Sequence, residues 1–402
     1  MPFDRLHWLV FALCLAGAAC ARAEGADDLQ FRAAIGLMHD SNLFRLPANA
    51  NTQALIGKSS PADTIGIGTL GVNYNKAYSL QRVELDASVT DYRYQNFGYL
   101  NFLAYNYSAA YRWSYTPHLY GNVTASRDQT LNNFADFRGF NLRNVRTNIR
   151  TRADATYELD ARWRVLGGLT VSSLGNSEPL IQEPDYRDKA VDAGVRYVLP
   201  TGSSAGYTFR STDGTYLNNR TLPSPGFYDT GFTQTDSSLL ATWVVSPDTS
   251  ANFRAGYRSR RHPNYPQRDF SGMTGAAQFT WSITGKSAIT AGWTRDLGTY
   301  ETGISNFTRT DRFSIGPTWA ISPKTTVRLS LERESQDFLG TPFGFAPLQR
   351  HDVTRNASVS IGWQALHSLL LNASLQNARR SSNLPGLDYT SNMINLTAQF
   401  TY

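Results

Sequence analysis

The chain ends in Ile394-Asn-Leu-Thr-Ala-Gln-Phe-Thr-Tyr402, a stretch in which apolar and polar side chains alternate without a break. Successive side chains of a β-strand point to opposite faces, so one face of this predicted strand carries Ile394, Leu396, Ala398, Phe400 and Tyr402. A strand with one apolar and one polar face is typical of a transmembrane β-barrel, which has lipid outside and water inside.

The same alternation runs through most of the chain. Between residues 145 and 159 the apolar set is Val145, Ile149, Ala153, Ala155, Tyr157 and Leu159, and charged side chains lie between its members. A soluble β-sandwich shows the same period, but it needs a second layer over its apolar face, and no part of the sequence indicates one. The charged residues of such strands are therefore predicted to face the lumen: Arg82, Glu84, Asp86, Arg146, Arg150, Arg152, Asp154, Arg164, Arg196, Arg254, Arg258, Arg328 and Glu332.

Five segments place a tryptophan four residues before a tight-turn signal, as in Trp113-Ser-Tyr-Thr-Pro117 and Trp319-Ala-Ile-Ser-Pro323. Tryptophan favours the membrane–water boundary, where its ring is buried and its N–H stays hydrated. We therefore predict an interfacial girdle above short periplasmic turns, formed by Trp113, Trp163, Trp243, Trp281, Trp319 and Trp363.

Counting turns gives the number of strands. Short turns are predicted near Asn75–Ala77, Pro117–His118, Leu159–Arg162, Pro200–Gly202, Pro247–Thr249, Gly285–Lys286, Pro323–Thr325 and Leu366–Ser368. With nine connections at the other end, they predict an all-β, antiparallel up-and-down barrel of about 18 strands with both termini in the periplasm. Sixteen strands is the alternative, because Ile65 and Ile67 are out of phase with Leu70, Val72 and Tyr74. A bulge in that strand would reconcile them.

The first 23 residues predict a secretory signal peptide. Arg5 precedes an apolar stretch from Leu6 to Ala19, and Ala21-Arg22-Ala23 is an A-x-A cleavage signal. A lipoprotein site at Cys20 is the weaker alternative, because Gly17 stands where an aliphatic residue is usual. Both cysteines, Cys14 and Cys20, lie in this leader, so residues 24–402 form a cysteine-free barrel in a single domain.

Charge and composition narrow the function. Of 38 Lys and Arg residues, 33 are arginine, whose planar guanidinium suits carboxylates and phosphates. The lumen is thus predicted either to favour anionic or uronic-acid-containing glycans, or to carry Arg–Asp/Glu pairs that rigidify the wall. Removing Arg5, Arg22 and Asp4 with the leader changes the net charge from +6 to +5, a modest excess that indicates no nucleic-acid partner.

No motif for catalysis or cofactor binding is present. The sequence lacks G-x-S-x-G, H-E-x-x-H, a P-loop and paired Cys/His spacings. We expect no enzyme activity, no cofactor and no metal. A barrel enzyme, which needs a Ser–His pair on adjacent strands, is the minority alternative.

The opening segment Phe31-Arg-Ala-Ala-Ile-Gly-Leu-Met-His-Asp-Ser-Asn-Leu-Phe-Arg-Leu-Pro47 resembles the start of the EpsL family, outer-membrane barrels of exopolysaccharide biosynthesis operons, including exosortase-associated ones. The resemblance implies a role in exporting or assembling an exopolysaccharide. Its specific part is Asp40, Ser41, Asn42, Leu43, Phe44 and Arg45, a good turn-former that fixes how the first loop leaves the rim or folds the loop inward as a constriction. The ending Phe400-Thr-Tyr402 resembles the signal read by the outer-membrane barrel assembly machinery, although Phe is the more usual last residue.

The sequence thus leaves three functions open. The first is a passive conduit or secretion partner for a polysaccharide, with periplasmic export components as partners. The second is a general or anion/sugar-selective diffusion porin with an inward-folded loop. The third is a barrel enzyme or scaffold with a plugged lumen. All three place the protein in the outer membrane of a Gram-negative bacterium, in contact with lipid and lipopolysaccharide.

Overall fold

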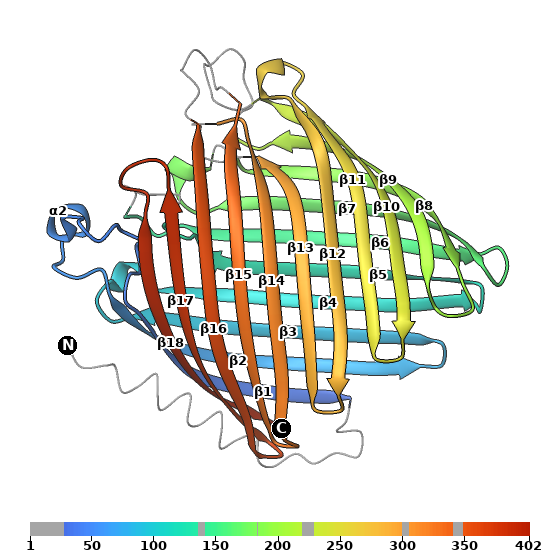
Figure 1. Ribbon diagram of the computed structural model, residues 1–402, viewed down its shortest axis with the longest axis horizontal. Coiled ribbons are helices and arrows are strands. Elements are labelled where there is room, and N and C mark those ends of the chain that lie inside the picture. Colours follow the sequence, from blue (N-terminus) through green and yellow to red (C-terminus); the bar gives the residue numbers. More distant parts are fainter. Residues whose placement is uncertain (1–27, 136–140, 183, 219–228, 300–304, 341–348) are drawn as a thin grey trace.

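A single closed sheet forms the molecule. The computed structural model describes residues 28–135, 141–182, 184–218, 229–299, 305–340 and 349–402. Within them, eighteen antiparallel strands each pair with their neighbours in the sequence. Strand β1 (Leu29–Asp40) pairs with β2 (Asp63–Tyr78) on one side and with β18 (Tyr389–Thr401) on the other, which closes the sheet. The protein is therefore an eighteen-stranded up-and-down barrel, as predicted, and the sixteen-strand alternative is wrong (Figure 1).

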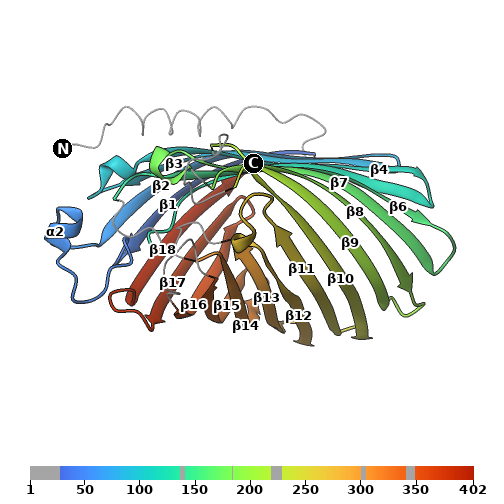
Figure 2. The same ribbon diagram turned by 90° about the horizontal axis from the view of Figure 1, so that it is seen from above.

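The remaining strands complete the wall. Seen from above, β1–β8 form one side and β9–β18 curve around the other (Figure 2). Their bounds are β3 (Gln81–Tyr94), β4 (Phe102–Thr116), β5 (Leu119–Leu131), β6 (Val145–Glu158), β7 (Trp163–Asn176), β8 (Tyr186–Val198), β9 (Ser204–Tyr216), β10 (Gly231–Ser246), β11 (Thr249–Arg261), β12 (Phe270–Thr284), β13 (Ser287–Thr299), β14 (Phe307–Ser322), β15 (Thr325–Leu339), β16 (Arg350–Leu366) and β17 (Leu369–Ser382).

The two ends of the barrel differ in the length of their connections. Short turns join each even-numbered strand to the next at the end where the C-terminus lies (Figure 1). The predicted first turn near Asn75–Ala77 is wrong, because β2 continues to Tyr78 and Ser79, with a φ of 57°, begins the reversal. The opposite connections carry α2 (Thr52–Ile56) and the short 3-10 helices η2 (Gly98–Leu100), η3 (Pro179–Ile181) and η4 (Pro266–Arg268). No helix of the described residues is long and apolar enough to cross a membrane.

The tryptophan repeats are bulged hairpins. The ladders shift register at the turn ends of β4, β10, β12, β14 and β16, the five strands that carry the repeats. In β4 the skipped residue is Tyr115, two positions after Trp113, and the Thr116 hydroxyl then accepts the N–H of Leu119 at 3.0 Å. A bulge increases local twist and a hydroxyl cap fixes a tight turn. The repeat therefore specifies a tight turn between two strands as well as the place of the tryptophan side chain.

Strand β2 contains no bulge. Its pairing with both β1 and β3 runs in unbroken register, so the predicted irregularity at Ile65 and Ile67 is wrong. These two side chains instead face the interior, where Ile65 is fully buried under the first loop. The change of phase thus marks a part of the inner wall that is covered by protein rather than water.

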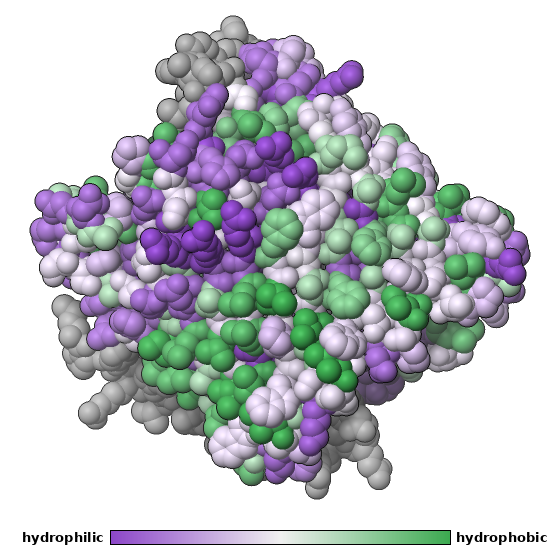
Figure 3. Space-filling model, viewed as in Figure 1, coloured by the Kyte–Doolittle hydropathy of each residue, from purple (hydrophilic) through white to green (hydrophobic). Residues whose placement is uncertain are grey.

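The apolar side chains of the strands lie on the outer surface of the barrel. Exposed large side chains such as Leu37, Leu169, Leu239, Trp319 and Leu375 belong to the apolar face of their strands. Figure 3 shows hydrophobic side chains gathered in a band across the barrel, with hydrophilic ones above it over the loop ends of the front strands. The predicted signal peptide, residues 1–23, lies outside the described residues.

Candidate functional site

The inner wall carries the charges of the barrel. The structure places all the charged residues expected in the lumen on the face opposite the exposed apolar side chains. In β6, for instance, Arg150 and Arg152 alternate with Ile149 and Ala153, and Ile149 is exposed on the outside. The full set on this inner face is Arg82, Glu84, Asp86, Arg146, Arg150, Arg152, Asp154, Arg164, Arg196, Arg254, Arg258, Arg328 and Glu332.

Many of these residues form ion pairs between strands. Examples are Arg258 with Asp236 at 2.7 Å, Arg164 with Glu158 at 2.9 Å and Arg112 with Glu84 at 3.0 Å. Five further inner-face residues take part in these pairs and were not predicted, although the same alternation includes them. Arg32 binds Asp86, and Arg112 binds Glu84. The other three are Asp192, Arg210 and Asp236. Paired charges at these positions are what the wall-stiffening interpretation predicts.

The strongest network lies on β6–β9. Both guanidinium nitrogens of Arg152 donate to the Asp192 carboxylate, at 2.5 and 2.9 Å, across the intervening strand β7. Arg152 also donates to the buried Thr170 hydroxyl at 3.2 Å, and Arg210 lies 3.5 Å from Asp192. Two parallel N–H···O bonds fix the guanidinium plane, so this cluster is a rigid part of the wall.

Four other inner-face arginines have no such partner. Arg150, Arg196, Arg254 and Arg328 form no ion pair among the residues that the structure describes, and they lie on β6, β8, β11 and β15. On the same inner face, near the short turns of β3 and β4, Arg82 keeps 49% of its side-chain exposure and Arg112 keeps 56%. The inner wall is therefore partly open to water and carries arginines without an ion pair.

Hydrogen bonds hold the start of the first loop to β18, at the seam of the barrel where β1 pairs with β18. Asp40, at the end of β1 and 2% exposed, accepts hydrogen bonds from the Asn42 N–H, the Arg45 guanidinium and the Ser391 hydroxyl, the last at 2.6 Å. Ser41 and Asn392 exchange two further bonds, at 3.0 and 2.8 Å. Arg45 has a φ of 56°, in the left-handed region, and its N–H donates to the carbonyl of Asn42 at 3.1 Å, which closes a tight turn.

Phe44 then enters the mouth of the barrel. It is 2% exposed, and its ring lies 4.7 Å from those of both Phe97 and Phe134, which belong to two other loops. The buried cluster also contains Leu43, Leu46, Ile65, Tyr94 and Leu100, and inward-facing Met38, Ile67, Tyr92 and Phe102 pack against it. Three loops are therefore held together against the inner wall of β1–β4.

Replacing Asp40 with asparagine is expected to release the first loop from β18. Arg45 then lacks its carboxylate partner while its side chain is only 13% exposed, and breaking a buried pair costs about 3–5 kcal/mol. Hydrogen exchange at residues 41–46 should accelerate, whereas exchange on β9 and β10, far along the wall, should not change. Equal protection of residues 41–46 in both proteins would show that the hydrogen bonds of Asp40 do not hold the loop.

A second buried cluster lies at the loop end of β16 and β17, two strands from β1. Arg350 and Arg380 both contact Asp352, at 2.5 and 3.6 Å, and all three are at most 6% exposed. Arg380 also donates to the carbonyl of Ala135 at 2.6 Å, although Ala135 follows β5. The loop after β5 therefore reaches across the mouth to β17, which narrows the entrance at this point.

His262, just beyond β11, is a buried titratable group at the loop end of the barrel. It is 4% exposed, and burial and the neighbouring Arg260 and Arg268 lower its pKa to about 4, against the opposing effect of Asp269 and Asp229. When the loop is open, His262 binds a proton from about pH 6.5 downward. When the loop is packed, His262 stays neutral until about pH 4.

The loop at residues 262–269 is therefore expected to lose stability as the pH falls from 6.5 to 4, by about 3 kcal/mol in total. Hydrogen exchange of this loop, corrected for intrinsic rates, should speed up across that window. In His262→Gln the pH dependence should disappear. Persistence of the same pH dependence in the variant would exclude His262 as its source.

The residues predicted for the membrane boundary and for assembly lie at the short-turn end. Trp163, Trp243, Trp281, Trp319 and Trp363 are exposed on the outer face and Trp113 is half-buried there. Phe400 pairs with Ala33 across the seam, and Tyr402 exchanges two backbone hydrogen bonds with Phe31, at 2.7 and 2.9 Å. The last residues therefore take part in closing the barrel. Their role in assembly stays a prediction.

No group of three or more His, Cys, Asp or Glu side chains placed to hold a metal ion occurs in the described part of the chain. The inner wall thus offers arginines, carboxylates in pairs with them, and hydroxyls. Such a wall can attract and orient solutes.

Comparison with known proteins places the fold. Residues 243–402 match the model of a family described as Putative beta-barrel porin 2. No curated protein matches the chain. Among solved structures, the outer membrane protein OpdK of Pseudomonas aeruginosa is 13% identical with a TM-score of 0.51, over 94% of this chain and 99% of that one. OccK9 (OpdG) of the same organism is 10% identical with a TM-score of 0.52 and the same two coverages. A structure of OpdK with vanillate is 12% identical, with a TM-score of 0.50 and again the same coverages. The chain is therefore similar in fold, over 94% of its length, to outer membrane proteins of Pseudomonas aeruginosa.

Proposed function

We propose that the protein is an outer-membrane porin through which small anionic solutes diffuse. The observation that carries this proposal is the set of inner-face arginines without an ion pair, Arg150, Arg196, Arg254 and Arg328, in a hydrated wall. An unpaired guanidinium attracts carboxylates and phosphates, and partner carboxylates neutralise most of the other arginines. Similarity to the OpdK fold supports this proposal, and OpdK has been seen with vanillate, a carboxylate.

The architecture suits passive diffusion. A barrel of this strand number has room for an aqueous channel unless loops fill it. Here the first loop and the loop after β5 pack into the mouth and leave the charged wall behind them hydrated. A narrow mouth above a wide, charged interior selects by size first and by charge second.

Solute flux tests this function. Purified protein in liposomes should admit gluconate several-fold faster than glucose, because the two differ little in size and the carboxylate is attracted to the wall. Protein-free liposomes provide the baseline. Equal entry of both solutes would contradict anion preference, and no entry of either would contradict a channel.

Export of a polysaccharide is the second candidate. The observation in its favour is the Asp40–Arg45 segment, which resembles the EpsL family, and which here stands at the mouth, where it would meet a polymer. On this alternative the protein works with periplasmic export components. Purified exopolysaccharide should then block the flux of gluconate at micromolar polymer concentration. Flux that is indifferent to the polymer would favour the porin. In both cases we propose that the signal peptide is removed near Ala23 and that assembly into the outer membrane begins from Phe400 and Tyr402.

A further inference from the structure

The outer face of the barrel carries a row of arginines that the channel does not use. Arg333 on β15 pairs in register with Arg355 on β16, and Arg355 pairs in register with Arg379 on β17. All three share the outward face with Leu331, Val359 and Leu375, which are 42–53% exposed. Like charges directly opposite each other on neighbouring strands destabilise a sheet, so this row needs an explanation.

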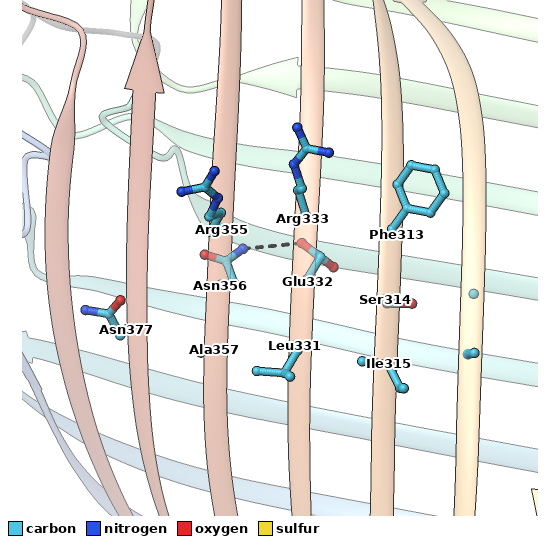
Figure 4. A pocket seen from close by; sticks show the side chains of 12 residues that line it. Phe313, Ser314, Ile315, Leu331, Glu332, Arg333, Arg355, Asn356, Ala357 and Asn377 are labelled. Atoms are coloured by element: carbon cyan, nitrogen blue, oxygen red, sulfur yellow. Dashed lines mark hydrogen bonds between the residues drawn. The ribbon is translucent and has the colours of Figure 1, made fainter.

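Acidic side chains do not neutralise the row. The carboxylates of its outward neighbourhood already have partners: Asp311 accepts two bonds from Arg295, and Asp337 binds Arg309 and His351. Glu332 precedes Arg333 in the chain but faces inward, where it accepts a bond from Asn356 at 3.3 Å (Figure 4). Arg333, Arg355 and Arg379 form no ion pair among the residues that the structure describes.

A shallow apolar hollow lies beside the row. It encloses about 550 Å³ on the outer face and is lined by small residues, Ala291, Gly292 and Ala357, between larger ones, Phe313, Ile315 and Leu331. Figure 4 shows the side chains of Arg333 and Arg355 directed toward the loop ends, above the apolar part of the hollow. The site is therefore amphipathic, with cations at its upper edge and a hydrocarbon surface below.

The height of the row matches the outer boundary of a membrane. Thr325 pairs with Trp363, which belongs to the predicted interfacial girdle above the short turns, and position 333 lies eight residue steps further along β15. At about 3.3 Å per residue and a tilt of about 40°, the row stands roughly 20 Å above that girdle, near the outer edge of an apolar band about 25 Å tall. Figure 3 shows hydrophilic side chains above the apolar band on this side of the barrel.

We propose that Arg333, Arg355 and Arg379 bind the phosphate groups of a phosphorylated membrane lipid whose acyl chains lie in the hollow beneath them. Arginine's guanidinium binds phosphate oxygens in pairs, and three arginines on adjacent strands span roughly 10 Å, enough for a head group with two phosphates. Bound phosphate removes the repulsion along the row, and the acyl chains cover Phe313, Ile315 and Leu331. The proposal needs the barrel to lie in a membrane but does not need it to conduct.

The test compares lipids that differ only in phosphate. Wild-type protein in phosphatidylcholine nanodiscs receives bisphosphorylated lipid A or the same lipid after removal of its phosphates, and retained lipid is counted by native mass spectrometry. Wild type should retain the phosphorylated lipid at least tenfold better. Arg333→Gln/Arg355→Gln/Arg379→Gln should lose this difference. The control Arg187→Gln/Lys189→Gln/Arg261→Gln removes three other exposed outward charges and should behave as wild type.

Three outcomes would overturn the proposal. One is equal retention of the phosphorylated and dephosphorylated lipid by wild type, a result that does not depend on any variant folding. Another is unchanged retention by the correctly folded triple variant, with folding judged from its gel mobility before heating. The third is a triple variant that changes the oligomeric state but not lipid retention, which would assign the row to a contact between protein copies.

Discussion

Phe44→Ala is expected to widen the mouth of the channel and to raise its single-channel conductance. The Phe44 ring joins the first loop to Phe97 and Phe134, and it is almost completely buried. Truncating a buried phenylalanine costs about 3–5 kcal/mol, which is enough to weaken the packing of this part of the loop even while the hydrogen bonds of Asp40 hold its first residues to β18. The loop should therefore leave the wall for part of the time, and open-channel current should become larger and noisier.

The matched control is Gln53→Ala, an exposed residue of α2 in the same loop, which should conduct as wild type does. The strands themselves should be unaffected in both variants, because Phe44 lies outside the sheet. If Phe44→Ala folds and its conductance equals that of wild type, the Phe44 cluster does not limit the passage.

Removing unpaired positive charge from the wall is expected to weaken anion preference. Arg196→Gln/Arg254→Gln/Arg328→Gln neutralises three inner-face cations that hold no ion pair in the described structure, so the sheet should fold normally. In a water-like dielectric one unit charge within about 4 Å of a passing ion contributes about 1 kcal/mol, and about 1.4 kcal/mol is a factor of ten. The ratio of chloride to potassium permeability should therefore fall roughly tenfold.

This ratio follows from the reversal potential in a salt gradient. The outward triple Arg187→Gln/Lys189→Gln/Arg261→Gln removes the same charge from the other face and should keep the wild-type ratio. Arg152→Gln is a poorer probe of selectivity, because it also breaks the bonds to Asp192 and Thr170. Identical reversal potentials for wild type and the inner-face triple would remove the role assigned to these arginines.

The sequence predicted the barrel well because alternation is a local property. Ile394–Tyr402 and residues 145–159 each show which face meets lipid, and the turn signals divide the chain into eighteen strands. The tryptophan repeats predict a girdle, and the register shifts show that the same five segments also form bulged turns. A bulge depends on how two strands pair, which one strand's sequence does not specify.

The candidate site was less accessible from sequence. Ile65 and Ile67 are out of phase in the sequence because the cluster that covers them combines the first loop with Phe97 and Phe134, which come from later loops of the chain. The partners of the lumen arginines raise the same difficulty: Arg152 and Asp192 are 40 positions apart and meet only across β7. Alternation identifies which face a charge takes, and the register between neighbouring strands decides which charges remain unpaired.

Single-channel recording of the wild-type protein in a planar bilayer tests the central claim most directly. With a tenfold gradient of potassium chloride, we predict discrete current steps whose reversal potential has the sign of chloride preference. A stable insertion that never conducts, or one that conducts with potassium preference, would contradict a hydrated barrel whose wall selects anions.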